Sequence, residues 1–180
     1  MASDARVRYT KMVIIQSFVK LLKEESINRI TVKEICAMAE INRATFYKHY
    51  LDVYDLLDKI EEQFLNELHE VLNSRENNTL KDTLTFIMVS FKAEEEMYSA
   101  IASPNGDPAF PKKVFDACYH FVRPQAIVPK HLTEAQREWM YCFTAYGCNG
   151  ILTKWISNGM KEPISEVADF AEQMIVNVTK

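Results

Sequence analysis

The residues best suited to chemistry lie in one short stretch, residues 42–50, which reads NRATFYKHY. At helical spacing Phe46 and Tyr50 share one face, so the polar and cationic side chains are left on the other. Such a helix fits the major groove of DNA, where base edges present distinct donor and acceptor patterns. Together with the start of the preceding helix, the candidate DNA-contacting residues are Thr31, Asn42, Arg43, Ala44, Thr45, Tyr47, Lys48 and His49.

Members of this set suit different parts of a duplex. Arg43 can bond guanine at two acceptors, and the methyl group of Thr45 suits thymine. Lys48 and His49 suit phosphates or base edges, and most such contacts set register and not sequence. From spacing alone, the alternative is a surface helix with ordinary polar groups.

A helical segment immediately upstream must position this stretch. Thr31 and Glu34 have the spacing of a capping box, in which each side chain bonds the backbone N–H of the other. Glu40 and Ile41 then form a turn, and Asn42 is a good cap for the next helix. Two helices joined by a turn of a few residues, with polar groups on the second, are typical of a helix-turn-helix.

This pattern resembles the TetR family of transcriptional regulators. In that family the turn leads into a short helix that reads roughly T-[FLY]-Y-x-[HY]-[FY], and residues 45–50 read TFYKHY. The likeness extends upstream through residues 14–22 and 30–39 and downstream through residues 52–57. Residues 150–175 resemble the C-terminal domain of the branch that includes activators of dihydroxyacetone-use operons.

The chain departs from the family pattern at two positions. The turn usually carries glycine where this chain has Glu40, and a left-handed conformation costs a non-glycine residue about 1 kcal/mol. We therefore expect the turn to be shaped differently, with the carboxylate repelling a nearby phosphate. The following helix often starts with lysine where this chain has Val53, which predicts the loss of one phosphate contact.

Composition predicts an all-α fold. The chain has 180 residues, 48% hydrophobic and 26% charged, with only 4 glycines and 6 prolines. All-β folds need many turn residues, so this scarcity favours long helices. No apolar run is long enough to cross a membrane, and the polar N-terminus lacks the apolar core of a signal peptide. We expect a cytoplasmic protein with no membrane partner.

Charge is unevenly distributed along the chain. The overall net charge is −4, but residues 1–54 carry +3 and residues 55–180 carry −7. A basic segment attached to an acidic body is expected where only one end meets phosphate. The asymmetry is modest and supports the motif.

Periodicity predicts a series of helices. Apolar stripes indicate helices over residues 6–24, 52–73, 79–102, 110–122, 133–158 and from 163 onward, with loops at 74–78 and 123–132. The predicted architecture is a three-helix helix-turn-helix domain, residues 1–53. A long helix joins it to a helical ligand-binding and dimerisation domain, residues 54–180.

The last two helices differ in pattern. Residues 139–156 are apolar nearly all round, which predicts burial on more than one side. Gly147 and Gly150 would let another backbone come close, although Asn149-Gly150 could instead be a turn. The family resemblance implies that these two helices pair with their copies in a homodimer.

Sites other than the DNA-binding stretch are less distinct. Aromatic residues of the body could wall a pocket for an unknown small-molecule effector, although aromatic residues at helical spacing are more often plain core. The candidates are Phe91, Tyr98, Tyr119, Trp139, Phe143 and Tyr146. No catalytic motif is present, and the HE of residues 69–70 lacks the closing histidine of a zinc site. The four cysteines have no metal-ligand spacing, which predicts buried thiols. We expect no metal, no cofactor and no enzyme activity.

The sequence therefore predicts a homodimeric, sequence-specific DNA-binding regulator, a repressor acting on a palindromic operator under control of a small molecule. The alternative is a coregulator or activator that binds a partner protein through its C-terminal domain, with weak or no DNA binding of its own. Glu40 and Val53 motivate that alternative.

Overall fold

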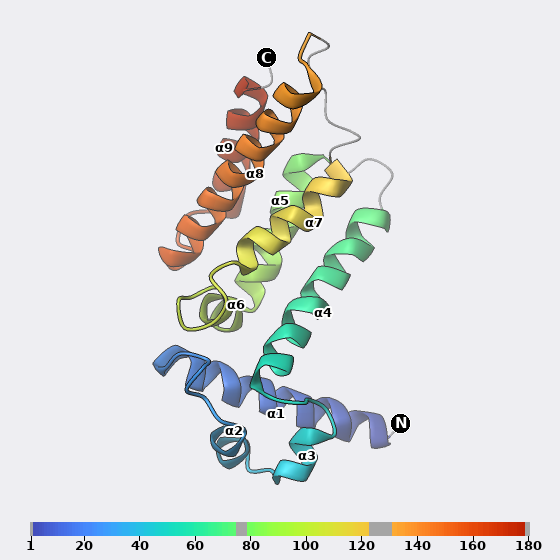
Figure 1. Cartoon of the computed structure of the whole chain (residues 1–180), viewed down its shortest axis with the longest axis vertical. Coiled ribbons are helices and arrows are strands. Elements are labelled where there is room, and N and C mark those ends of the chain that lie inside the picture. Colours follow the sequence, from blue (N-terminus) through green and yellow to red (C-terminus); the bar gives the residue numbers. More distant parts are fainter. Residues whose placement is uncertain (1, 75–78, 123–130, 179–180) are drawn as a thin grey trace. The chain divides into compact units, whose positions relative to one another are not determined.

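The computed structural model describes residues 2–74, 79–122 and 131–178, in which all regular structure is helical (Figure 1). The helices are α1 (Ala2–Glu24), α2 (Val32–Met38), α3 (Arg43–Tyr47), α4 (Val53–Ser74), α5 (Leu80–Ala93), α6 (Glu95–Ile101), α7 (Phe110–Val122), α8 (Glu134–Ser157) and α9 (Ile164–Val178). The all-α prediction is confirmed for these residues. None of these helices is long and apolar enough to span a bilayer. The predicted loops at 74–78 and 123–132 lie largely outside the described residues.

The chain divides into two compact units. The N-terminal unit comprises Met1–Gln63 and Glu96–Pro108, and the C-terminal unit comprises Phe64–Glu95 and Ala109–Lys180. Helix α4 contributes residues to both. The predicted domain boundary after residue 53 stays a prediction, because compactness does not show which part folds or functions alone.

The N-terminal unit is built around α1. Helix α1 contacts α2, and α2 contacts α3. The predicted capping box starts α2: Glu34 N–H donates to Thr31 Oγ1 at 3.3 Å, and Thr31 N–H donates to Glu34 Oε2 at 2.9 Å. Side chains with no exposed surface form the core: Ile14, Phe18, Leu22, Ile35, Phe46 and Leu56.

The turn between α2 and α3 keeps a regular geometry despite the missing glycine. Glu40 takes the left-handed conformation itself, with φ of 54°. The N–H of Ile41 bonds Cys36 O at 3.0 Å, and the N–H of Glu40 bonds Ala37 O at 3.4 Å. These two bonds form a Schellman motif, which satisfies the last carbonyls of α2. The expectation of a differently shaped turn is therefore wrong, because the paired hydrogen bonds hold Glu40 at a cost of about 1 kcal/mol.

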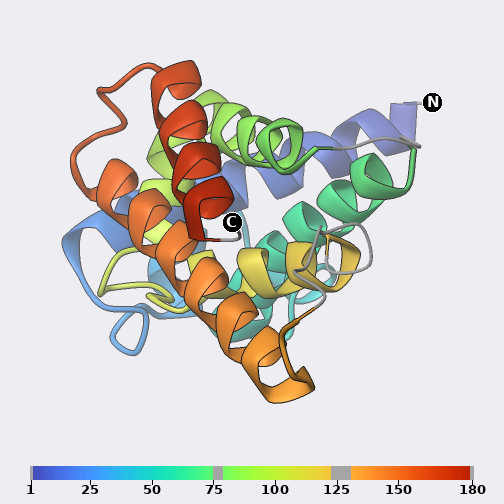
Figure 2. The ribbon, with the colours of Figure 1, turned by 90° about the horizontal axis from the view of Figure 1, so that it is seen from above.

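In the C-terminal unit, α5 packs against α9, and α8 packs against both α7 and α9 (Figure 2). Phe64, Phe91 and Phe110 are fully or almost fully buried and make ring contacts with centroids 5.2–5.9 Å apart. This aromatic cluster anchors α4, α5 and α7 to one another.

The predicted helix over residues 79–102 is two helices. Thr79 caps α5, with Asp82 N–H donating to Thr79 Oγ1 at 3.1 Å. Helix α5 ends at Ala93, because Glu94 has non-helical angles (φ −120°, ψ 44°). The break assigns α6 to the N-terminal unit. No glycine or proline marks it, so periodicity alone could not find it.

Helix α8 is continuous through Gly147 and Gly150, so the predicted alternative of a turn there is wrong. Predicted burial on more than one side does not occur within the part of the chain that the structure describes. Trp139, Phe143 and Tyr146 are 69%, 63% and 60% exposed. The reason is that α7 and α9 contact α8 and leave this face of its first half uncovered.

Candidate nucleic-acid interface

Helix α3 begins at the predicted cap. The Asn42 side-chain oxygen accepts the Thr45 backbone N–H at 2.8 Å and the Thr45 hydroxyl at 2.9 Å. The hydroxyl hydrogen of Thr45 is therefore committed to Asn42. What Thr45 can offer a duplex is its methyl group and its hydroxyl lone pairs, so it is poorly suited to donate to a phosphate.

Four of the eight candidate residues share one outward face of α3. These four, all exposed, are Arg43, Ala44, Tyr47 and Lys48. The last three follow Arg43 by one, four and five positions, which places them on the same side of a helix. The opposite face is anchored as predicted: Phe46 and Tyr50 are buried, with ring centroids 5.5 Å apart. Core packing thus fixes the rotation of a helix that is only five residues long.

The N-terminus of α2 already holds an anion. The carboxylate of Glu34 accepts both the N–H and the hydroxyl of Thr31, at 2.9 and 2.6 Å. The hydroxyl bond is the largest cause of a pKa for Glu34 below its usual value, followed by the backbone bond. An approaching phosphate would meet this carboxylate, which makes Thr31 a poorer candidate than the residues of α3.

Besides the adjacent Lys48, His49 lies near Lys11 and Lys59, which the motif did not indicate. Lys59 Nζ donates to the carbonyl oxygen of His49 at 3.0 Å, pairs with Asp55 at 2.9 Å and lies 5.5 Å from the ring centroid of Tyr50. Burial lowers the pKa of His49, and the charges of Lys11, Lys48 and Lys59 lower it further. Lys11 comes from α1, so the basic surface extends beyond the helix-turn-helix.

Val53, the second departure from the family pattern, is buried. It serves as a core residue at the start of α4 and presents no side chain to a duplex. Next to it, Asp55 Oδ2 accepts the Leu51 N–H at 2.7 Å, and Asp52 Oδ1 accepts the Asp55 N–H at 2.9 Å. These bonds secure the connection between α3 and α4.

The candidate effector residues that the structure describes lie in different surroundings. Phe91 is buried in the aromatic cluster, and Tyr98 is buried in the other compact unit. The side chain of Tyr119 lies outside the described residues. The remaining three, on α8, are exposed. The five described side chains therefore do not share one kind of environment, because helical spacing cannot tell a core face from a pocket wall or an outer face.

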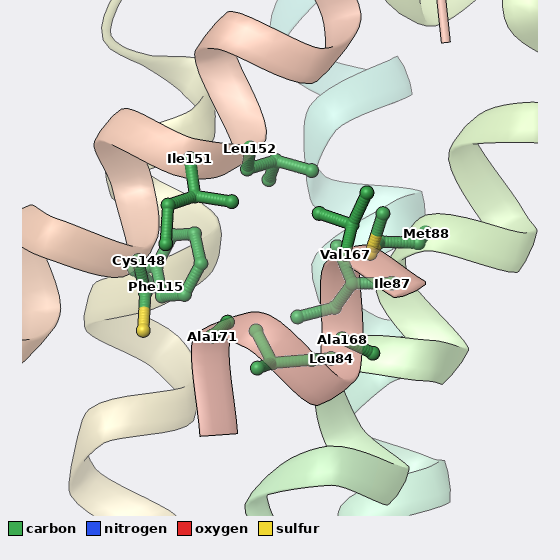
Figure 3. A pocket seen from close by; sticks show the side chains of 10 residues that line it. All are labelled: Leu84, Ile87, Met88, Phe115, Cys148, Ile151, Leu152, Val167, Ala168 and Ala171. Carbon is green, nitrogen blue, oxygen red and sulfur yellow. The ribbon is translucent and has the colours of Figure 1, made fainter. Parts of the chain in front are cut away.

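Two cavities of the C-terminal unit are lined by residues that the structure describes. The first, lined by apolar side chains of α5, α7, α8 and α9 (Figure 3), has a volume of only about 10 Å³, about the space of one water molecule. The second is an open groove of about 210 Å³ between α7 and α8, below the usual size of a ligand site. Lys112 bridges it, pairing with Asp116 at 2.6 Å and lying 5.7 Å from the Tyr146 ring centroid.

Cysteines and acidic residues supply no metal site in the described part of the chain. Cys36 and Cys148 are buried, as predicted, whereas Cys142 is exposed on α8 and lines the groove. The side chain of Cys118 lies outside the described residues. The prediction of buried thiols is therefore wrong for Cys142, which lies on the uncovered side of α8.

Known proteins resemble this chain both in sequence and in structure. A TetR model for the transcriptional regulator C-terminal region matches residues 78–177, whereas no curated protein gives a significant match. A TetR transcriptional regulator from Streptococcus agalactiae 2603V is 23% identical, with a TM-score of 0.71 over 97% of this chain and 98% of that one.

Two further solved structures show the same fold. The dihydroxyacetone kinase operon activator DhaS is 18% identical, with a TM-score of 0.63 over 94% of this chain and 96% of that one. FadR from Bacillus subtilis, solved with stearoyl-CoA, is 15% identical, with a TM-score of 0.63 over 94% and 99%. Because the C-terminal region model spans more than half of the residues, this protein belongs to the TetR family of transcriptional regulators.

Proposed function

We propose that the protein is a sequence-specific DNA-binding regulator that acts as a homodimer on a palindromic operator. The observation that carries the proposal is the outward face of α3, where Arg43, Ala44, Tyr47 and Lys48 are exposed above an anchored core. Arg43 is the candidate for reading guanine, and the methyl group of Ala44 suits thymine. Lys48 and Tyr47 are candidates for phosphate contacts, which set the register of the helix.

Dimerisation would use α8 and α9. Trp139, Phe143, Tyr146, Gly147 and Gly150 recur at helical spacing along the exposed face of α8. Contiguous exposed apolar surface of this kind marks interaction sites in soluble proteins. On α9, Phe170 and Met174 are also exposed. Two copies of these helices would form a two-fold, four-helix interface.

The glycines of α8 support a close helix contact in that dimer. A Cβ added at Gly147 or Gly150 would meet no atom within 4 Å apart from its own stretch of helix. Neither glycine is therefore required by the packing of its own chain, although each lowers helix propensity. A partner backbone lying against them would account for both, because only glycine leaves room for it.

We further propose that a small molecule binding the C-terminal unit controls operator affinity. FadR from Bacillus subtilis was solved with stearoyl-CoA, which supports a ligand-responsive body in this family. Repression is the simplest consequence of a dimer occupying an operator. Among the structural neighbours, NalD is named a repressor and DhaS an activator, so the sign requires a reporter assay on the regulated promoter.

The test is selection of bound duplexes from a randomised pool at about 0.15 M salt. We expect an inverted repeat whose half-site centres lie about 10 base pairs apart, or a multiple of that. The double variant Arg43→Ala, Lys48→Ala should lose enrichment, while Lys161→Ala, which removes an exposed charge of the C-terminal unit, should keep it.

Failure of the folded wild-type protein to enrich any duplex, with regulation unchanged in the double variant, would favour the coregulator alternative. The structure weakens the support that Glu40 and Val53 give to this alternative. The turn at Glu40 is regular and Val53 is a core residue, so neither removes the helix-turn-helix surface. The alternative itself stays a prediction.

A further inference from the structure

Four basic residues from three helices surround the end of α3. Lys11 belongs to α1, Lys48 is the C-cap of α3, His49 follows it, and Lys59 belongs to α4. Lys59 is held in place by the His49 carbonyl oxygen and by Asp55. Lys11 and Lys48 are exposed, so both can reach an external phosphate.

The imidazole of His49 is partly buried within this cluster. Its ring centroid lies 6.3 Å from that of Tyr50, and its backbone N–H bonds Phe46 O at 2.9 Å. The charged groups that face it are Lys11 of α1, the adjacent Lys48, and Lys59 of α4, which is paired with Asp55. Tyr50 stays neutral, because burial, with a smaller contribution from Asp55, raises its pKa to about 12.

In the free protein these surroundings oppose a charge on His49. Burial disfavours the imidazolium most, and three ammonium groups repel it. Its pKa therefore lies below the ordinary value of 6.5, and the neutral ring dominates at pH 7. A duplex brings phosphates that offset the charges of Lys11 and Lys48 and accept an N–H from the ring.

We propose that DNA binding by this protein is coupled to the uptake of one proton by His49. The proton comes from solvent and remains on the ring while the duplex is bound. The proposal rests on the proposed DNA-binding function and makes His49 a pH-dependent phosphate contact. DNA phosphates stay ionised between pH 6 and 8, so the titrating group belongs to the protein.

The sign follows from linkage. The complex holds a proton that the free protein lacks, so affinity must rise as pH falls through the range between the two pKa values of His49. One linked proton limits the effect to about tenfold per pH unit. Between pH 8 and pH 6 we expect wild-type affinity to rise at least about threefold more than that of a protein lacking this imidazole.

The experiment measures Kd for a mixed-sequence 30-base-pair duplex at pH 6, 7 and 8, at a constant salt concentration of about 50 mM, where phosphate contacts alone support binding. His49→Gln removes the titrating ring, and His69→Gln, at an exposed position of α4, is the matched control. The pH dependence should be lost in the first variant and kept in the second. An unchanged pH dependence in His49→Gln would overturn the proposal.

A second measurement needs only the wild-type protein. Calorimetric titration in two buffers of different ionisation enthalpy counts the protons taken up on binding, and we expect a net uptake of up to one at pH 7. Zero uptake with clear DNA binding overturns this inference and leaves the DNA-binding function intact. Absence of binding to any duplex at every pH overturns both.

Discussion

Replacing Gly147 by alanine should act in opposite directions on the single chain and on the proposed dimer. Gly147 lies inside α8, and a Cβ there meets no atom within 4 Å apart from its own stretch of helix. Within one chain the alanine should stabilise α8 by about 0.5–1 kcal/mol, because glycine loses more conformational freedom on entering a helix.

In the dimer the same methyl group falls on the proposed close contact between helices. Adding a methylene to a well-packed interior costs about 1–3 kcal/mol, and a two-fold interface receives each substitution twice. Taking about 2 kcal/mol per dimer as a low value, the dimer Kd should rise about 30-fold. Gly150→Ala should act in the same direction.

Sedimentation velocity over a dilution series measures the dimer Kd. Circular dichroism, recorded during heating at dilutions where the protein is monomeric, measures the thermal stability of the single chain. Asn66→Ala is the control, because Asn66 is exposed on α4 and alanine there also improves helix propensity. It should leave the dimer Kd unchanged. A Gly147→Ala protein that dimerises as tightly as wild type would refute the close contact, and a less stable monomer would refute the open space around Gly147.

Four further changes test the local structure. Gly106→Ala should destabilise the N-terminal unit by about 1–3 kcal/mol, because the new Cβ would clash with Ile101 O and lie 2.9 Å from Ala100 O; an unchanged Tm would contradict this. Asn42→Ala should cost about 1 kcal/mol in urea unfolding, since it removes the cap of α3, and should also weaken duplex binding. At pH 8, iodoacetamide should modify Cys142 far faster than Cys148, because burial raises the pKa of Cys148 to about 11; peptide mapping with equal rates would count against it. Because hydrogen bonds from Thr31 lower the pKa of Glu34, its stabilising effect should be present above its usual value of 4.5 and lost as pH falls below it, and Glu34→Gln should reduce the acid dependence of unfolding.

Local signals predicted the local structure well. Caps at Thr31 and Asn42 start α2 and α3 where the sequence placed them, because a cap is a contact between residues three apart. The inward positions of Phe46 and Tyr50 followed from helical spacing for the same reason. The exposed polar face of α3 could therefore be predicted from the sequence alone.

Features that depend on distant residues were not readable in this way. The break at Glu94 carries no glycine or proline. Tyr98, expected to line a pocket of the C-terminal domain, follows this break and belongs to the N-terminal unit. Lys11 and Lys59, which act on His49 together with the adjacent Lys48, come from other helices, and no local pattern joins them. Glu40 occupies the left-handed region because two backbone bonds compensate the strain there.

The sequence by itself determined the helical class, the helix starts and the polar face of α3, because these depend on contacts within one or two turns of a helix. Only the tertiary structure decided which apolar faces find a neighbour. Periodicity marks a face as apolar, but burial requires another element to lie against it. Phe91 packs against Phe64 and Phe110. Trp139 and Phe143 are not covered by any other element of the described chain and stay exposed.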